Sequence, residues 1–285
     1  VDFNIEYYRR KTSSMLMDVP YPYTTGISSL YENVGGLLNQ GLDLTLGVDI
    51  LRGKDYYLRF QTTFNWNSEK VTELFNGLDR WEMVGYGFAY VVGQPVSFYY
   101  PIYAGIDPED GLPMWYLPGE NVDETTMDPS RVTKTFDESG LTQNTGTRLN
   151  PPINGGFSIG GAWRGLSLQA DFSYVLGKYL INNDAFFYAN PFQNLDCTQH
   201  KDVQDFWTPE NTDAKYPDWS QGVTMQFDTH LLEKANFLRL KNLQVGYDLP
   251  RHLLGTQQVV NGLKFSFTAR NLFCLTNYSG IDPEV

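Results

Sequence analysis

Residues 166–176 read LSLQADFSYVL, and apolar and polar side chains alternate along this stretch. The apolar positions are Leu166, Leu168, Ala170, Phe172, Tyr174 and Leu176, and the positions between them are polar from Ser167 to Ser173. Successive side chains of a β-strand point to opposite faces of a sheet. This period of two therefore predicts a strand with one apolar face and one polar face.

The same alternation recurs along the chain, in residues 1–7, 42–50, 56–67, 96–102, 157–163, 243–249 and 263–269. Little of the sequence has the period of an amphipathic helix, so the fold class is all-β. One segment changes phase, because Leu238 and Leu240 are out of step with Leu243 and the residues after it. A β-bulge near Lys241, or a strand that starts there, accounts for the change.

Alternation alone fits both a soluble β-sandwich and a membrane β-barrel. Several segments run to about ten residues, which suits a tilted membrane strand better than a soluble sheet. Short connections at 52–55 and 164–165 also alternate with long ones at 12–40, 67–94, 118–153 and 178–236, as in outer-membrane barrels. This parity requires a further strand near residues 112–117 (LPMWYL). The prediction is one domain, an up-and-down antiparallel meander of about nine long strands.

Composition excludes some classes of protein. The formal net charge of −12, from 33 acidic and 21 basic residues, argues against nucleic-acid binding. The sequence contains no run of 18 apolar residues, so no transmembrane helix is predicted. Aromatic residues make up 15%, with 19 tyrosines, and these side chains suit membrane interfaces and sugar stacking.

No motif of covalent or metal chemistry is present. His200, His230 and His252 lie far apart, without the spacing of a zinc site or a catalytic triad. Loop carboxylates are numerous, but no pair stands out as a glycosidase pair. We therefore expect no enzyme activity, no catalytic residue, no metal and no cofactor.

The longest loop contains DFWTPENTDAKYPDW, in which Trp207, Tyr216 and Trp219 are candidate substrate-binding residues for a sugar or peptide. The alternative is that these rings pack the loop against itself. Cys197 and Cys274, the two cysteines of the chain, fall at the same side of the sheet by loop parity. Whether they form a disulfide is left open.

The C-terminal region resembles a known family. ANFLRLKNLQVGYDLPRHLL at 235–254 and LKFSFTARNLFCLTNYSGIDPEV at 263–285 resemble the near-C-terminal strands of SusC-like (SusC/RagA) TonB-dependent transporters. ENVGGLLNQGLDLTL at 32–46 is similar to the family's entry to a strand, with Asp43 where glutamate is usual. VGQPVSFYYPIYAGIDPEDGLPMWY at 92–116 is similar to a further stretch, whereas LPGENVDETTMDPS at 117–130 departs from the family pattern.

The resemblance implies that residues 1–285 are the C-terminal portion of a plugged outer-membrane barrel of the 22-strand class. The plug, the TonB box and earlier strands are then expected before Val1, and a final strand after Val285. It also implies import of oligosaccharides or peptides through the outer membrane of a Gram-negative bacterium, with a SusD-like surface lipoprotein and energy from TonB. The rival interpretation is a soluble secreted β-sandwich that binds glycans.

In the transporter interpretation the two faces of the sheet meet different media. Polar residues face the lumen and contact plug or solvent: Arg59, Gln61, Asn65, Gln169 and Asp171. Their apolar neighbours face outer-membrane lipid: Phe60, Phe64, Leu168 and Phe172. A tag within 178–236 is then expected to be reachable on intact cells, and a tag at 52–55 is not.

One short motif occurs twice, as YAGIDPE at 103–109 and YSGIDPE at 278–284. Loop parity predicts a periplasmic turn for the first copy and the start of an external loop for the second, so that they do not form one site. Their likeness is interpreted as turn chemistry, because Gly permits positive φ, Asp bonds to nearby backbone and Pro presets φ.

Overall fold

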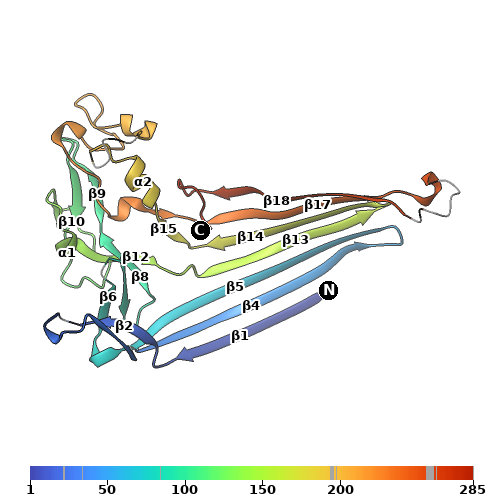
Figure 1. Ribbon diagram of the computed structural model, residues 1–285, viewed down its shortest axis with the longest axis horizontal. Coiled ribbons are helices and arrows are strands. Elements are labelled where there is room, and N and C mark those ends of the chain that lie inside the picture. Colours follow the sequence, from blue (N-terminus) through green and yellow to red (C-terminus); the bar gives the residue numbers. More distant parts are fainter. Residues whose placement is uncertain are drawn as a thin grey trace.

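The computed structural model describes residues 1–285 except 22, 34, 84, 193–195, 197, 255–259, 261 and 285. Its main element is an antiparallel sheet of seven long strands in the order β1-β4-β5-β13-β14-β17-β18 (Figure 1). These strands are β1 (Asp2–Thr12), β4 (Gly35–Arg52), β5 (Tyr56–Leu74), β13 (Ile153–Trp163), β14 (Leu166–Leu176), β17 (Phe237–Asp248) and β18 (Lys264–Thr276).

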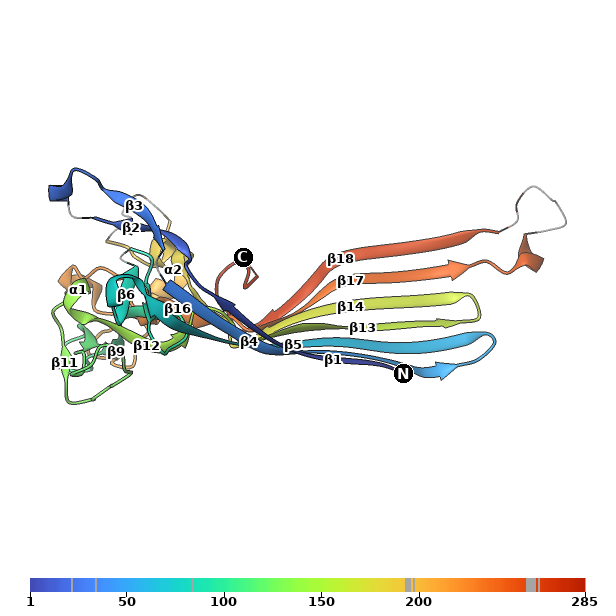
Figure 2. The ribbon, with the colours of Figure 1, turned by 90° about the horizontal axis from the view of Figure 1, so that it is seen from below.

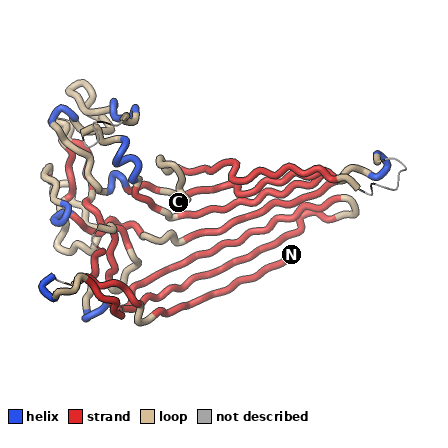
Figure 3. Tube along the Cα trace, in the orientation of Figure 1, coloured by secondary structure: helices blue, strands red, loops and turns tan. Residues whose placement is uncertain are grey.

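Short and long connections lie at opposite ends of this sheet, as Figures 1 and 2 show. The short end carries the β4–β5, β13–β14 and β17–β18 connections. Arg164 and Gly165 both have positive φ, at 47° and 89°, which gives the two-residue turn that matches the twist of a hairpin. The long connections gather at the other end into a separate body of loops and small sheets, which we call the loop body (Figure 3).

The loop body contains the remaining described strands: β2 (Leu16–Pro20), β3 (Ser29–Asn33), β6 (Arg80–Met83), β7 (Phe88–Val91), β8 (Ser97–Pro101), β9 (Tyr103–Ile106), β10 (Pro113–Tyr116), β11 (Val132–Thr133), β12 (Thr142–Arg148), β15 (Tyr179–Ile181) and β16 (Leu232–Lys234). They form small sheets in the orders β12-β8-β7-β6, β11-β10-β9, β15-β16 and β2-β3. Its helices are α1 (Glu138–Leu141) and α2 (Asn183–Tyr188). Short 3-10 turns include η3 (Lys201–Gln204), η4 (Trp219–Gln221) and η5 (Thr229–Leu231).

The all-β antiparallel meander is confirmed, but the number of long strands is wrong. Within the described ranges seven strands form the wall, not about nine. Residues 96–102 and 112–117 form β8 and β10, which have five and four residues and pair inside the loop body. Tyr99 and Trp115 are only 2% and 3% exposed, so these short strands are buried rather than set in a wall. Alternating sequence does not distinguish the two cases.

The predicted bulge is confirmed. The pairing of β17 with both neighbours shifts by one residue at Lys241, so that Leu240 pairs with Phe172 and Leu243 with Ala170. The extra residue returns the apolar side chains before and after it to the same face of the sheet.

The predicted division between faces is also confirmed by the strand register. Arg59, Gln61, Asn65, Gln169 and Asp171 share one face, while Phe60, Phe64, Leu168 and Phe172 share the other. On the polar face, Arg59 pairs with Asp2 and with Asp49, the latter at 2.9 Å. That the polar face meets the lumen and the apolar face meets lipid stays a prediction.

Among the residues that the structure describes, no helix is long and apolar enough to cross a membrane.

Candidate functional site

A cavity of about 320 Å³ lies inside the loop body, at the end of the sheet away from the hairpin tips. Its walls come from strands β9 and β10 and from the long segment between β14 and β17. Five aromatic side chains line it: Tyr103, Trp115, Tyr188, Tyr216 and Trp219. The lining also includes charged or titratable groups: His200, Asp202, Lys215, Asp228, His230 and Glu233. The cavity is therefore an aromatic chamber with several polar groups.

Two buried asparagines give the long segment its shape. The Asn182 side chain caps helix α2 by accepting the Ala185 N–H at 3.0 Å. Asn190 exchanges two hydrogen bonds with the backbone of Met225, at 3.1 and 3.3 Å. Both asparagines are fully buried. Because a buried amide is costly unless its hydrogen bonds are made, these contacts specify one path for the loop.

The three predicted binding residues take two different positions. Tyr216 and Trp219 line the cavity and stack on each other with ring centroids 5.8 Å apart. Trp207 lies elsewhere, where its Nε1–H donates to the Pro108 carbonyl at 3.2 Å and its ring covers Gly111. All three rings are buried to nine-tenths or more. Packing of the loop therefore accounts for Trp207, while ligand contact for Tyr216 and Trp219 stays a prediction.

Asp228 lines the cavity, and its side chain is only 1% exposed. It accepts a hydrogen bond from Trp115 Nε1 at 2.6 Å and contacts both the backbone N–H and Nδ1 of His230. The Tyr103 ring lies 5.2 Å from the His230 ring. Burial and the nearby Asp228 charge raise the pKa of Tyr103 above its ordinary value.

The two YxGIDPE copies meet at this cavity, contrary to the prediction that they lie at opposite ends. Tyr103 of the first copy and Ser279 of the second both line it. Ser279 binds Glu233 through its backbone N–H at 2.8 Å and its hydroxyl at 2.7 Å. The prediction failed because it counted β8 and β10 as wall strands, which reversed the side assigned to the first copy.

The interpretation of the motif as turn chemistry is confirmed for both aspartates and for Gly105, which has φ of 106°, whereas Gly280 does not adopt a positive φ. In the first copy Asp107 accepts the Glu109 N–H at 2.8 Å, and in the second Asp282 accepts the Glu284 N–H at 2.9 Å. Each aspartate also meets a cation, Lys134 for Asp107 and Arg239 for Asp282.

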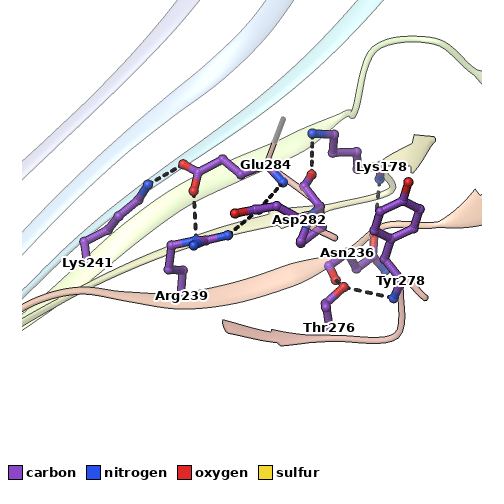
Figure 4. A network of polar contacts seen from close by, with 9 residues as sticks. Lys178, Asn236, Arg239, Lys241, Thr276, Tyr278, Asp282 and Glu284 are labelled. Carbon is purple, nitrogen blue, oxygen red and sulfur yellow. Dashed lines mark hydrogen bonds and ion pairs between the residues drawn. The ribbon is translucent and has the colours of Figure 1, made fainter. Parts of the chain in front are cut away.

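The second copy is held against the polar face of the sheet (Figure 4). Arg239 of β17 pairs with Asp282 and, through Nε, with Glu284 at 2.8 Å. Lys241 also pairs with Glu284, and Lys178 donates to the Pro283 carbonyl. Ser279 therefore contacts the cavity while Asp282 and Glu284, a few residues on, are fixed on the sheet.

The apolar face of the sheet carries two rows of large apolar side chains, most of which are exposed. Near the hairpin tips, one row runs across five neighbouring strands: Tyr56, Trp163, Leu166, Tyr247 and Phe265. Near the loop body, a second row runs across five strands: Tyr7, Leu42, Trp66, Ile153 and Leu176. Trp163 is 60% exposed and Tyr7 63%. Such exposure of aromatic rings requires an apolar or interfacial environment.

Sequence reasoning missed Asp228, His230, Glu233 and Asn182, which come together only in three dimensions. The one available signal was the repeated YxGIDPE motif, because each of its two copies contributes a residue to the lining of the cavity. Within the described ranges, no cluster of three or more His, Cys, Asp or Glu could hold a metal ion. Cys197 lies outside the described residues, so its pairing with Cys274 stays open.

Comparison with known proteins places these features in context. No protein-family model matches the chain. The TonB-dependent receptor P26 of Formosa agariphila is 26% identical over 98% of this chain, and the TonB-dependent receptor SusC of Bacteroides thetaiotaomicron is 25% identical over 99%. A structure of the RagAB peptide transporter matches 99% of the chain with a TM-score of 0.89 and 40% identity.

The chain spans under a third of these proteins, with 29%, 27% and 30% of their respective lengths covered. The match to SusC and RagAB confirms the resemblance to SusC-like TonB-dependent transporters, and with it the fold as part of a barrel. These similar proteins are receptors and transporters rather than enzymes, in agreement with the sequence-based expectation.

Proposed function

We propose, from this kinship with the SusC-like TonB-dependent transporters, that the chain forms barrel wall and external loops of an active nutrient importer. Its location is the outer membrane of a Gram-negative bacterium. In this proposal residues 1–285 are the C-terminal portion of the barrel, and the plug and the TonB-contacting segment belong to other parts of the protein. The chain contributes binding and passage, not energy coupling.

The apolar face with its two rows is the observation that carries the proposal. Trp66 follows Tyr56 by ten residues on β5. At about 3.4 Å per residue and a tilt of roughly 40°, the rows lie about 25 Å apart along the membrane normal. This is the height of the apolar band of an outer-membrane barrel, and the Tyr, Trp and Phe rings within the rows are of the kind that forms the girdles flanking that band. The apolar face then meets lipid and the polar face meets the lumen.

The rival soluble β-sandwich requires a second layer over the apolar face. Phe3, Phe267 and Leu275 on that face are 63%, 65% and 60% exposed. In the described part of the chain no second sheet covers them, since the other sheets lie in the loop body (Figure 2). A soluble protein with such a face would aggregate.

The cargo that we propose is an oligopeptide or an oligosaccharide, delivered to the loop body by a SusD-like surface lipoprotein and imported with energy from TonB. The cavity beside Tyr216 and Trp219 supports direct contact of the loop body with the cargo. The 40% identity to a peptide transporter, against 25% to SusC, favours peptide.

Fractionation and uptake of the full-length protein test the proposal together. The protein is expected in the detergent-solubilised outer-membrane fraction, and deletion of its gene is expected to abolish growth on the imported peptides but not on free amino acids. Recovery from the periplasm or the medium without detergent would support the soluble glycan-binding alternative. Unimpaired peptide uptake after deletion would refute the import role.

A further inference from the structure

We infer that the cavity of the loop body binds an alkylammonium group, such as the side chain of a lysine in a peptide. This inference rests on the proposed import function and names the chemistry that its cargo presents to this site. It follows from the walls of the cavity, from its charges and from its size.

The walls provide aromatic rings on several sides. Tyr103 and Trp115 come from neighbouring strands β9 and β10, with ring centroids 6.4 Å apart. Tyr216 and Trp219 form the stacked pair from the long segment, and Tyr188 comes from the end of α2. The faces of such rings attract cations, most strongly where the cation is removed from water.

The charges of the cavity are mainly negative. Asp202, Asp228 and Glu233 line it, against one permanent cation, Lys215, and two imidazoles, His200 beside Asp202 and His230 beside Asp228. Asp228 and Glu233 have no lysine or arginine partner among the described residues, and the donors to Glu233 are the neutral groups of Asn182 and Ser279. Each carboxylate oxygen has two lone pairs, so these bonds leave capacity for a further donor. Asp228 is buried and contacts His230, whereas Glu233 is half-buried and has only neutral partners, so Glu233 gains free energy when a cation binds beside it.

One lysine of the chain itself is bound in this way, by an aromatic ring and a carboxylate, among the residues that line the cavity. The Lys215 ammonium lies 5.3 Å from the centroid of the Tyr216 ring and 3.3 Å from a carboxylate oxygen of Asp202. An ammonium is thus held between an aromatic face and a carboxylate, which is the arrangement that we infer for the ligand next to Asp228 and Glu233.

The size and the burial of the rings argue against a sugar. A volume of about 320 Å³ is at the small end of ligand pockets, enough for one side chain or chain terminus. Trp115, Tyr216 and Trp219 are each at most 9% exposed, so none offers the broad open face on which a pyranose ring stacks.

Two matched peptides test the inference on the purified full-length transporter in detergent. N-acetylated Ala-Lys-Ala-Ala and N-acetylated Ala-norleucine-Ala-Ala differ only in the ammonium group. Calorimetry is expected to show at least roughly tenfold tighter binding of the lysine peptide, the factor that one lost charge-assisted contact gives. Equal affinities would overturn the inference while leaving peptide import intact. Binding of neither peptide would also overturn the inference, and only peptide uptake that is unimpaired after deletion of the gene would overturn the proposed function as well.

A variant then locates the site. Glu233→Gln keeps the shape of the side chain and removes its charge, so it is expected to bring the lysine-to-norleucine affinity ratio close to one. Asp248→Asn, at the far end of the sheet beside Lys264, is the matched control and is expected to keep the wild-type ratio. A Glu233→Gln protein that keeps the ratio would contradict the assignment to this cavity. The norleucine comparison needs no variant, so misfolding of Glu233→Gln cannot hide a negative result.

Discussion

Arg239 and Asp282 form an ion pair across 43 residues of sequence, and this pair ties the second YxGIDPE copy to the polar face of β17. The Arg239 side chain is only 10% exposed, so the pair lies at the base of the folded-back segment rather than at its surface. The segment spans the short distance from the sheet to the cavity, where Ser279 binds Glu233. The pair therefore fixes one wall of the candidate site.

Replacement of Arg239 by Met should release this segment. The change keeps an apolar stem but removes the hydrogen-bond donor to Asp282 and the positive charge that pairs with Asp282 and Glu284, so the amides of 278–284 are expected to exchange with deuterium several times faster. Lys264→Met, which removes an exposed pair with Asp248, is the control and should leave these amides unchanged. Equal protection in the Arg239→Met and wild-type proteins would show that the pair does not hold the segment.

The same pair predicts a dependence on pH. The Glu284 N–H and the Arg239 guanidinium lower the pKa of Asp282 below its ordinary value. A carboxyl with a lowered pKa in the folded state stabilises that state above the ordinary value of about 4 and loses this contribution as pH falls through the lowered value. Protection of 278–284, corrected for intrinsic exchange rates, should be constant from about pH 7 to 5 and should fall below about pH 4. If protection fell between pH 7 and 5, a group other than Asp282 would be responsible for the pH dependence.

Arginine scanning of β14 tests which face meets lipid. Ala170 lies on the apolar face between the two rows, and Gln169 is its neighbour on the polar face. Ala170→Arg is expected to destabilise the barrel by about 2–4 kcal/mol and to lower its yield in the outer membrane. Gln169→Arg, beside Asp171, is expected to cost much less. The yield of folded protein, measured by resistance to unfolding in detergent, compares the two. The reverse order would mean that the faces are assigned wrongly.

Gly111 supports the position of Trp207. It has φ of +73°, and a Cβ there would lie 2.6 Å from the Trp207 ring. Gly111→Ala therefore suffers about 1–2 kcal/mol of left-handed backbone strain together with displacement of the ring. Gly222 has φ of +69° and open space around it, so Gly222→Ala suffers the strain alone. Proteolysis of residues 205–222 should accelerate more for Gly111→Ala. Equal rates would show that Trp207 does not pack on this turn.

Much of the wall could be predicted because a membrane strand repeats its environment at every second residue. The phase change at Lys241 predicted the bulge, and the alternation from Leu166 to Tyr174 predicted both faces of β14. The positions of residues 96–102 and 112–117 could not be predicted in this way. A strand buried inside a loop body has the same alternation as a wall strand. Only its length of four or five residues distinguishes it from a wall strand.

The lining of the cavity could not be predicted from the sequence, for a different reason. Tyr103, Trp115, Asp228 and Ser279 are brought together by long loops whose path depends on buried contacts such as those of Asn182 and Asn190. Neither the periodicity of apolar residues nor the spacing of sequence motifs predicts such contacts. Tyr216 and Trp219 were predicted from composition alone, as aromatic residues in a polar loop, and Trp207 shares that composition without lining the cavity.

Labelling of single cysteines on intact cells tests the membrane topology most directly. Cys197 and Cys274 are first replaced by serine in the full-length protein, and cysteine is then introduced at Glu109, in the loop body, or at Lys54, in the β4–β5 hairpin tip. A membrane-impermeant maleimide should label Glu109→Cys on intact cells, and Lys54→Cys only after the outer membrane is permeabilised. Labelling of Lys54→Cys on intact cells, with Glu109→Cys protected, would contradict a barrel wall whose loop body faces outward.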